Sequence, residues 1–211
     1  EIMPSLVGSE MCIRDSDSMQ RTLQSYEASA RDYDAIVADH APPEIEDALR
    51  RMVACMPAGG LVLEVGSGTG RDADFVESLG AIVRRTDATQ AFLDLQAERG
   101  KQGALLNVVT DALGGPFDAI LAMAVLIHVD RVQIAPVLRK VFDALAPGGV
   151  FLAGMRIGQG ETNGDYQTVY WDRDRFAARL TAAGLRLDWE RQWIGREGVR
   201  WASFLACRPR G

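Results

Sequence analysis

The chain has 211 residues, of which 47% are hydrophobic and 25% charged, and its formal net charge is −6. A chain of this length and apolar content can bury a sizeable core as a single domain. The acidic balance gives no sign of a nucleic-acid partner, and no apolar run approaches the roughly 20 residues that cross a bilayer.

The few cysteines and histidines limit the chemistry further. Cys12, Cys55 and Cys207 are odd in number and have no metal or redox spacing, which favours a reduced, cytoplasmic protein. His40 and His128 are the only histidines, so we expect no histidine-based metal site.

The first residues stand apart from the rest. Residues 1–18 show no clear helical or strand period and lack the basic start and apolar stretch of a signal peptide. They resemble translated adapter read-through, so we expect a non-native or disordered leader, with the natural protein beginning near Met19. An ordinary disordered tail is the alternative.

Two helices are predicted next. Ser25–His40 is helix-like, Pro42 and Pro43 interrupt it, and Glu44–Cys55 places apolar residues on one stripe. Residues 19–58 are therefore expected to form an N-terminal helical cap.

The most informative stretch is LVLEVGSGTGRDAD at residues 61–74. An apolar strand leads to Glu64 and then to Gly66, Gly68 and Gly70. Glycines are needed where the backbone turns with positive φ or approaches a ligand closely. A dinucleotide-binding loop reads G-x-G-x-x-G, whose third glycine would fall at Arg71, so the pattern here is a different one.

Strands and helices then alternate along the chain, which predicts a parallel sheet with right-handed crossovers. Acidic residues follow the second and third predicted strands, Asp87 and Asp111. Between Asp111 and Phe117 there is room for a short helix at most. Predicted strands span residues 81–86, 104–109, 117–123 and 150–155, and predicted helices span 72–79, 90–99 and 131–145.

The C-terminal part is expected to begin irregularly, over residues 158–170, and to continue with a helix over residues 173–184. Two strand-like runs follow, Leu185–Ile194 and Val199–Arg208. The short segment between them suits a hairpin.

The ordered set of an E-x-G-x-G-x-G loop, acids after two further strands and Pro147-Gly148-Gly149 before the fifth resembles the class I S-adenosylmethionine (SAM) methyltransferases. The resemblance covers about residues 26–209. It implies an α/β, Rossmann-like, doubly wound, mostly parallel seven-stranded sheet with strand order 3-2-1-4-5-7-6 and a C-terminal antiparallel hairpin. It also implies a SAM-binding methyltransferase domain over residues 59–211.

The same resemblance implies roles for individual residues. Asp87 would bind the ribose hydroxyls and Asp111 would face the adenine amine, whereas Tyr33 would cap the cofactor. Each acid alone also suits a helix N-cap, as Asp87 does for a helix starting near Thr89. The expected cofactor-binding residues are Tyr33, Glu64, Gly66, Ser67, Gly68, Gly70, Asp87, Asp111, Ala112 and Met123.

Methyl transfer from a sulfonium is an in-line displacement, so the protein mainly positions the reactants and excludes water. His128 is the candidate catalytic residue, because its ordinary pKa range suits a general base. The alternative is that His128 only lines the site. Candidates for the acceptor pocket are Arg156, Tyr166, Tyr170, Trp171, Trp193 and Arg200, and they suggest an anionic or aromatic acceptor. Trp193 and Trp201 are alternatively core residues.

The sequence therefore predicts a cytoplasmic SAM-dependent methyltransferase that acts on an O, N or C nucleophile of a small molecule, as a monomer or homodimer without a nucleic-acid or membrane partner. The alternatives are a SAM-binding protein without turnover and an NAD-dependent oxidoreductase. A nucleic-acid methyltransferase is disfavoured, because Ala124–Val129 stands where an N/D-P-P-Y/F loop is expected.

Overall fold

A computed structural model describes residues 7–37 and 40–210, with the side chains of all of these except 7–17 and 197. The helices are α1 (Val7–Ile36), α2 (Pro43–Ala54), α3 (Arg71–Ser78), α4 (Gln90–Glu98), α5 (Ile134–Ala144) and α6 (Arg173–Ala182). The strands are β1 (Leu61–Val65), β2 (Ile82–Asp87), β3 (Gly103–Leu105), β4 (Phe117–Met123), β5 (Leu145–Arg156), β6 (Glu161–Asn163), β7 (Gln167–Val169), β8 (Arg186–Ile194) and β9 (Arg200–Cys207).

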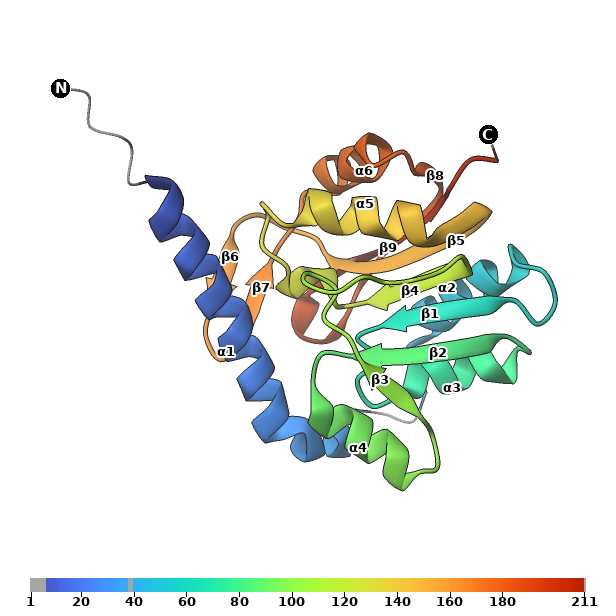
Figure 1. Ribbon diagram of the computed structural model, residues 1–211, viewed down its shortest axis with the longest axis horizontal. Helices are drawn as coiled ribbons and strands as arrows, with labels where there is room; N and C mark the ends of the chain where they lie inside the picture. Colours follow the sequence, from blue (N-terminus) through green and yellow to red (C-terminus); the bar gives the residue numbers. More distant parts are fainter. Residues whose placement is uncertain (1–6, 38–39, 211) are drawn as a thin grey trace.

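Seven strands form one sheet in the order β3-β2-β1-β4-β5-β9-β8 (Figure 1). β1 to β5 pair in parallel, and β9 pairs antiparallel with both β5 and β8. This is the expected strand order with its C-terminal hairpin, so the predicted fold class is confirmed.

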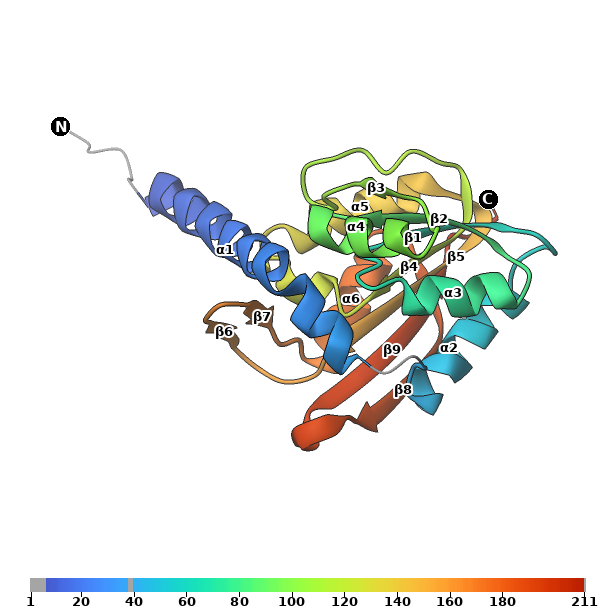
Figure 2. The ribbon, with the colours of Figure 1, turned by 90° about the horizontal axis from the view of Figure 1, so that it is seen from below.

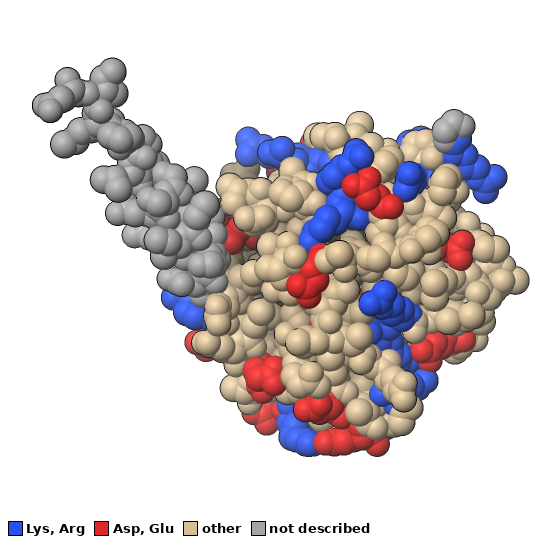
Figure 3. Space-filling model, in the orientation of Figure 1, with Lys and Arg blue, Asp and Glu red and all other residues tan. Residues whose placement is uncertain are grey.

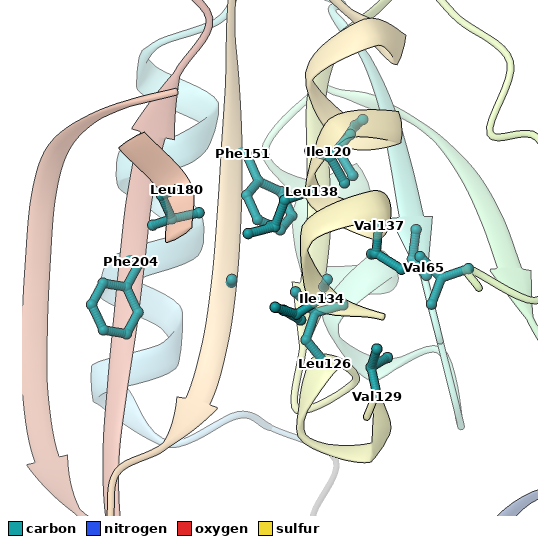
Figure 4. Packing of buried hydrophobic residues seen from close by; sticks show 14 of the residues in the cluster. Val65, Ile120, Leu126, Val129, Ile134, Val137, Leu138, Phe151, Leu180 and Phe204 are labelled. Atoms are coloured by element: carbon teal, nitrogen blue, oxygen red, sulfur yellow. The ribbon is translucent and has the colours of Figure 1, made fainter. Parts of the chain in front are cut away.

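Apolar side chains that alternate along the strands bury both faces of the sheet. Leu63, on one face, belongs to the larger core, to which α5 and α6 contribute (Figure 4). Val62, its neighbour in β1, packs on the opposite face with residues of α2. Figure 2 shows this three-layer arrangement from below. The sheet is thus a rigid platform whose strand ends can hold a site.

Three local expectations differ from the structure. α1 already starts at Val7, so residues 7–18 are helical, whereas residues 1–6 of the expected leader lie outside the described part. α1 ends at Ile36, short of the expected end at His40, and residues 38–39 are not described. The stretch that was expected to be irregular contains the antiparallel pair β6–β7.

The third predicted strand is also shorter than expected. β3 ends at Leu105, because the following residues fold into a turn in which the Asp111 amide donates to the Asn107 carbonyl at 2.9 Å. No helix is assigned between Asp111 and Phe117, as the sequence indicated.

α1 lies across the end of the sheet to which β1 and β2 point, next to α4 and β7 (Figure 1). Glu27 of α1 accepts a hydrogen bond from the Ala91 amide at 3.1 Å, which caps the first turn of α4. Arg31 pairs with Glu98 at 2.5 Å. α1 is therefore docked as a roof over the carboxyl ends of the parallel strands, where open α/β sheets bind ligands.

Candidate functional site

A cavity of about 750 Å³ lies beneath this roof, a size within the usual range of small-molecule sites. Its floor is formed by the ends of β1, β2, β4 and β5, and its walls by α1, the β6–β7 hairpin and Trp201 of β9. Six of the sequence-predicted site residues line it: Tyr33, Gly66, Gly68, Asp87, Met123 and His128.

The glycine loop approaches the cavity with its backbone. Gly66 has φ +65°, and a Cβ there would lie 2.4 Å from Val125 Cγ2. Gly68 has φ +51° and nothing within 4 Å of its would-be Cβ, so its backbone faces open space. Both positions require glycine, one for packing and conformation and one for conformation alone.

Ser67 and Gly70 do not line the cavity but support the loop. The Ser67 hydroxyl accepts a hydrogen bond from Gln96 Nε2 at 2.8 Å. Gly70 precedes α3 with φ +85° and packs against Arg85 and Gln96. These residues set the shape of the loop.

Asp87 lies at the end of β2 and is 6% exposed. Its Oδ2 accepts the Gly68 amide at 2.7 Å and its Oδ1 accepts the Thr89 amide at 2.8 Å. Burial raises the pKa of Asp87, while these two amides act against the rise. A carboxylate has about four lone-pair sites, so the two oxygens retain capacity for hydroxyl groups in the cavity.

Glu64 is buried beneath the loop rather than in the cavity lining. Its exposure is 3%, and its Oε2 has no hydrogen-bond partner. Burial first, and the nearby Asp72 second, raise the pKa of Glu64 well above its ordinary value. Glu64, in β1 next to the glycine loop, is thus a buried acid outside the cavity lining.

The structure does not bring Asp111 or Ala112 to the cavity; both are exposed beyond it. The Asp111 carboxylate instead accepts the Asn107 amide at 2.9 Å and the Thr110 hydroxyl at 2.8 Å. Asn107 and Val108 line the cavity in its place. Asp111 thus holds the turn that carries the lining residues.

After Met123 the chain leaves β4 in an unusual conformation. Ala124 is the only non-glycine residue with positive φ in the described part of the chain, at +58°. Such residues cluster at ligand sites. The turn carries Val125 against Gly66, a contact that no sequence signal indicated.

His128 lines the cavity and is held at both ring nitrogens. Nδ1 contacts the Gln167 carbonyl at 2.5 Å, and since a carbonyl only accepts, Nδ1 carries the proton. Nε2 is then the acceptor for the Tyr26 hydroxyl, at 3.1 Å. Burial lowers the pKa of His128 below 6.5, so the ring is neutral at neutral pH.

Tyr26 and Tyr33 face an aromatic cluster at the cavity wall. The Tyr26 ring lies 4.6 Å from Tyr166 and 5.7 Å from Phe92, and the Tyr33 ring lies 5.6 Å from Phe92. Burial raises the pKa of Tyr26 strongly, so its phenol stays protonated. The Tyr166 hydroxyl also contacts Ser29 at 2.7 Å, which joins the hairpin to α1.

Only some of the residues predicted for the acceptor pocket line the cavity. Arg156 and Tyr166 line the cavity, and so does Trp201, which the sequence suggested only as a core residue. The remaining candidates lie outside the lining: Tyr170, Trp171, Trp193 and Arg200. Of these, Trp171 is a core residue at 3% exposure, and Trp193 stacks on Trp201 at 6.3 Å.

Two site types find no support in the described residues. Among the side chains that the structure describes, no three His, Cys, Asp or Glu residues group in a way that could hold a metal ion. Within residues 7–37 and 40–210, no helix has both the length and the apolar character that a membrane crossing requires.

Comparison with known proteins identifies the domain. Residues 63–151, from β1 into β5, match the family model described as a methyltransferase domain. No curated protein matches the chain significantly.

Solved structures share the fold over nearly the whole chain. The 1,6-didemethyltoxoflavin-N1-methyltransferase of Burkholderia thailandensis, with 1,6-didemethyltoxoflavin and S-adenosylhomocysteine bound, is 18% identical, with TM-score 0.72 over 99% of this chain and 93% of its own. Magnesium protoporphyrin IX methyltransferase of Synechocystis PCC 6803, with bound SAM, is 13% identical, with TM-score 0.71 over 91% and 97%. The CcbJ methyltransferase of Streptomyces caelestis is 19% identical, with TM-score 0.70 over 86% and 96%.

Proposed function

We propose that the chain, whose residues 63–151 match the methyltransferase-domain family model, is a class I SAM-dependent methyltransferase and methylates an O, N or C nucleophile of a small molecule. The observation that carries this proposal is a single cavity lined both by the glycine loop and by a hydrogen-bonded Tyr26–His128 pair. The side formed by the glycine loop suits the cofactor, and the side formed by the Tyr26–His128 pair offers a proton acceptor.

The residues of the first side fit SAM. Gly66 and Gly68 both line the cavity, and Gly68 has open space where a side chain would stand, so the backbone of the loop can approach a ligand. Asp87 has acceptor capacity at the position where ribose hydroxyls are bound in such units. We propose that Gly66, Gly68 and Asp87 hold the cofactor, with Tyr33 and Met123 along its length.

When bound, SAM supplies an electrophilic methyl group on its sulfonium. The protein's contribution is to orient the nucleophile and to exclude water, which is the main source of rate in such displacements. The roof formed by α1 supports this role, because its aromatic residues Tyr26 and Tyr33 close the cavity against Phe92.

The Tyr26–His128 pair offers a route for the proton that the nucleophile loses. The acceptor's proton passes to the Tyr26 oxygen as the Tyr26 hydroxyl proton passes to His128 Nε2. The result is a neutral tyrosine and an imidazolium whose Nδ1–H still donates to the Gln167 carbonyl. Tyr26 is then the residue in contact with the acceptor, and His128 is the base behind it.

A small acceptor is favoured over a macromolecule. Residues of α1 and of the β6–β7 hairpin line the cavity beside the strand ends, and a cavity of this size suits a small molecule. On the face seen in Figure 3, basic and acidic side chains are interspersed, so that face offers no extended cationic surface for a phosphate backbone. The enzymes that share the fold include one solved with the small molecule 1,6-didemethyltoxoflavin.

The proposal extends to the arrangement of the chain. Residues 19–58 act as a helical cap on the methyltransferase domain, because α1 docks on α4 through Glu27 and Arg31. Residues 1–18 are not required for activity, and the protein works in the cytoplasm as a monomer or homodimer.

The test is a screen for S-adenosylhomocysteine release with SAM and a panel of small phenols, amines, carboxylic acids and activated carbon acids, beside single-stranded DNA, RNA and denatured protein. Turnover with a small molecule alone is the expected result. Turnover only with a nucleic acid or a protein would refute the proposal. Truncation to Met19 is expected to leave turnover unchanged.

A further inference from the structure

Arg156, at the end of β5, lies on the acceptor side of the cavity. In the sheet, β4 separates β5 from β1, whose end carries the glycine loop. Arg156 is thus two strands away from the strand that carries the loop, and it lines the cavity together with His128 and Tyr166. It is the only lysine or arginine among the described lining residues.

The guanidinium has no counter-charge in the described part of the protein. No carboxylate forms an ion pair with Arg156 within 4 Å, and its Nε is buried without a hydrogen-bond partner. Asp87, the buried acid of the cavity, is engaged by the Gly68 and Thr89 amides instead. A half-buried cation with free donors is costly unless a ligand supplies the missing acceptors.

The position of this cation is nevertheless fixed. Arg156 pairs with Trp201 across the β5–β9 ladder, and its guanidinium carbon lies 5.1 Å from the centre of the Trp201 ring. Trp193 stacks on Trp201 from the neighbouring strand, with an interplanar angle of 13°. The Trp201 indole holds the guanidinium by cation–π contact, and Trp193 supports that indole, while the buried Nε donor stays unused.

The charge of Arg156 also reaches the proposed proton route. Arg156 lines the same cavity as Tyr26 and His128, and its charge acts against the rise in the pKa of Tyr26 and contributes to the fall in the pKa of His128. An anion bound to Arg156 would therefore lie in the cavity that Tyr26 and His128 line.

We propose that the methyl acceptor is a small aromatic carboxylic acid, whose carboxylate pairs with Arg156 and whose ring packs among Tyr26, Tyr166 and Trp201. This rests on the proposed function above. A carboxylate matches the planar guanidinium fork and the single positive charge. A phosphate monoester, at about −1.5 to −2 charges, would leave excess negative charge in a cavity that also holds Asp87.

Binding measurements test the proposal independently of turnover. The protein is saturated with S-adenosylhomocysteine and titrated with benzoate, benzamide and phenyl phosphate, followed by NMR of each probe. We expect benzoate to bind about tenfold more tightly than benzamide, as a hydrogen bond to a charged group predicts, and more tightly than phenyl phosphate. Because no methyl group moves in this experiment, absence of turnover would count against the proposed function and not against this proposal.

Substitutions of Arg156 test whether its guanidinium causes the preference for benzoate. Arg156→Met should abolish the benzoate preference, and Arg156→Lys should retain part of it, while affinity for S-adenosylhomocysteine stays within about twofold. Arg200→Met, one position before Trp201 but exposed and outside the lining, is the matched control that keeps the preference. Should Arg156→Met fail to fold, the wild-type ratio and Arg156→Lys decide.

Four results would overturn the proposal: equal binding of benzoate and benzamide to the wild type, no binding of either, tighter binding of phenyl phosphate, or unchanged benzoate preference in Arg156→Met. A loss of S-adenosylhomocysteine affinity in Arg156→Met that matches the loss for benzoate would assign the guanidinium to the carboxylate of the cofactor.

Discussion

The two sides of the cavity are built in different ways. The cofactor side uses backbone of one short loop, Gly66–Gly68, and a carboxylate one strand away that is fixed by two amides. The acceptor side uses side chains from distant segments, such as Tyr26 and His128, which are 102 positions apart. On the cofactor side, the backbone maintains the binding geometry. On the acceptor side, substitution of single side chains can change which acceptor binds and how its proton is removed.

Asp87→Asn should produce the largest loss of cofactor affinity. An amide in place of the carboxylate cannot accept both the Gly68 and the Thr89 amide hydrogens and the ribose hydroxyls as well. The expected loss of S-adenosylhomocysteine affinity is about a hundredfold, the worth of two charge-assisted hydrogen bonds. Isothermal titration calorimetry measures it.

The matched control for this change is Asp111→Asn, an acid that also follows a predicted strand but lies outside the cavity. Its affinity should stay within about threefold of the wild type. If the Asp111 variant lost more affinity than the Asp87 variant, the placement of the cofactor side would be wrong.

Gly66→Ala should weaken the same binding less, by about tenfold. Left-handed backbone costs a non-glycine residue about 1–2 kcal/mol, and the new Cβ pushes on Val125. Gly164→Ala, where nothing lies within 4 Å and φ is not positive, is the control and should be silent. Equal affinity of the two variants would show that the loop does not approach the ligand.

The pH dependence of kcat/KM should report on the acceptor side of the cavity, where His128 lies. Burial lowers the pKa of His128, so the neutral ring persists to a pH below 6.5 and the proton acceptor is lost only under more acidic conditions. We expect kcat/KM to fall by about tenfold per pH unit below that pKa. The His128→Asn variant should lack this acid limb; an unchanged limb in that variant would assign it to another group.

Thr22→Val should have the smallest effect on the site, because the change in stability is confined to the roof formed by α1. The Thr22 hydroxyl accepts the Gln167 amide at 2.9 Å, and valine leaves that buried amide unpaired at a cost of about 1–3 kcal/mol. Hydrogen exchange should quicken in α1 and β7 and stay unchanged in β1 and β4. Thr181→Val, at an exposed position of α6, is the control; faster exchange throughout the sheet in Thr22→Val alone would contradict a local effect.

The fold was largely predictable because strand, turn and helix alternate in short local signals, and the resemblance supplied the strand order. The β6–β7 pair was not predicted, since its three-residue strands carry too little pattern. β3 was overestimated because an apolar run continues past Leu105 while Asp111 closes a turn.

Site residues that lie close together in the sequence could be predicted, whereas contacts between distant segments could not. Gly66, Gly68 and Asp87 follow from contiguous motifs, whereas the bond between Tyr26 and His128 depends on how α1 docks, which no spacing encodes. Asp111 shows that a local sequence signal can also mislead, because an acid after a strand can hold a turn as readily as it can face a ligand.

The most direct test of the account is His128→Asn measured in both assays, with the acceptor found by the screen. We predict methyl transfer lowered by about a hundredfold or more, with S-adenosylhomocysteine affinity within about twofold of the wild type. Near-full turnover, or an equal loss of affinity and rate, would contradict the assignment of His128 to the acceptor side.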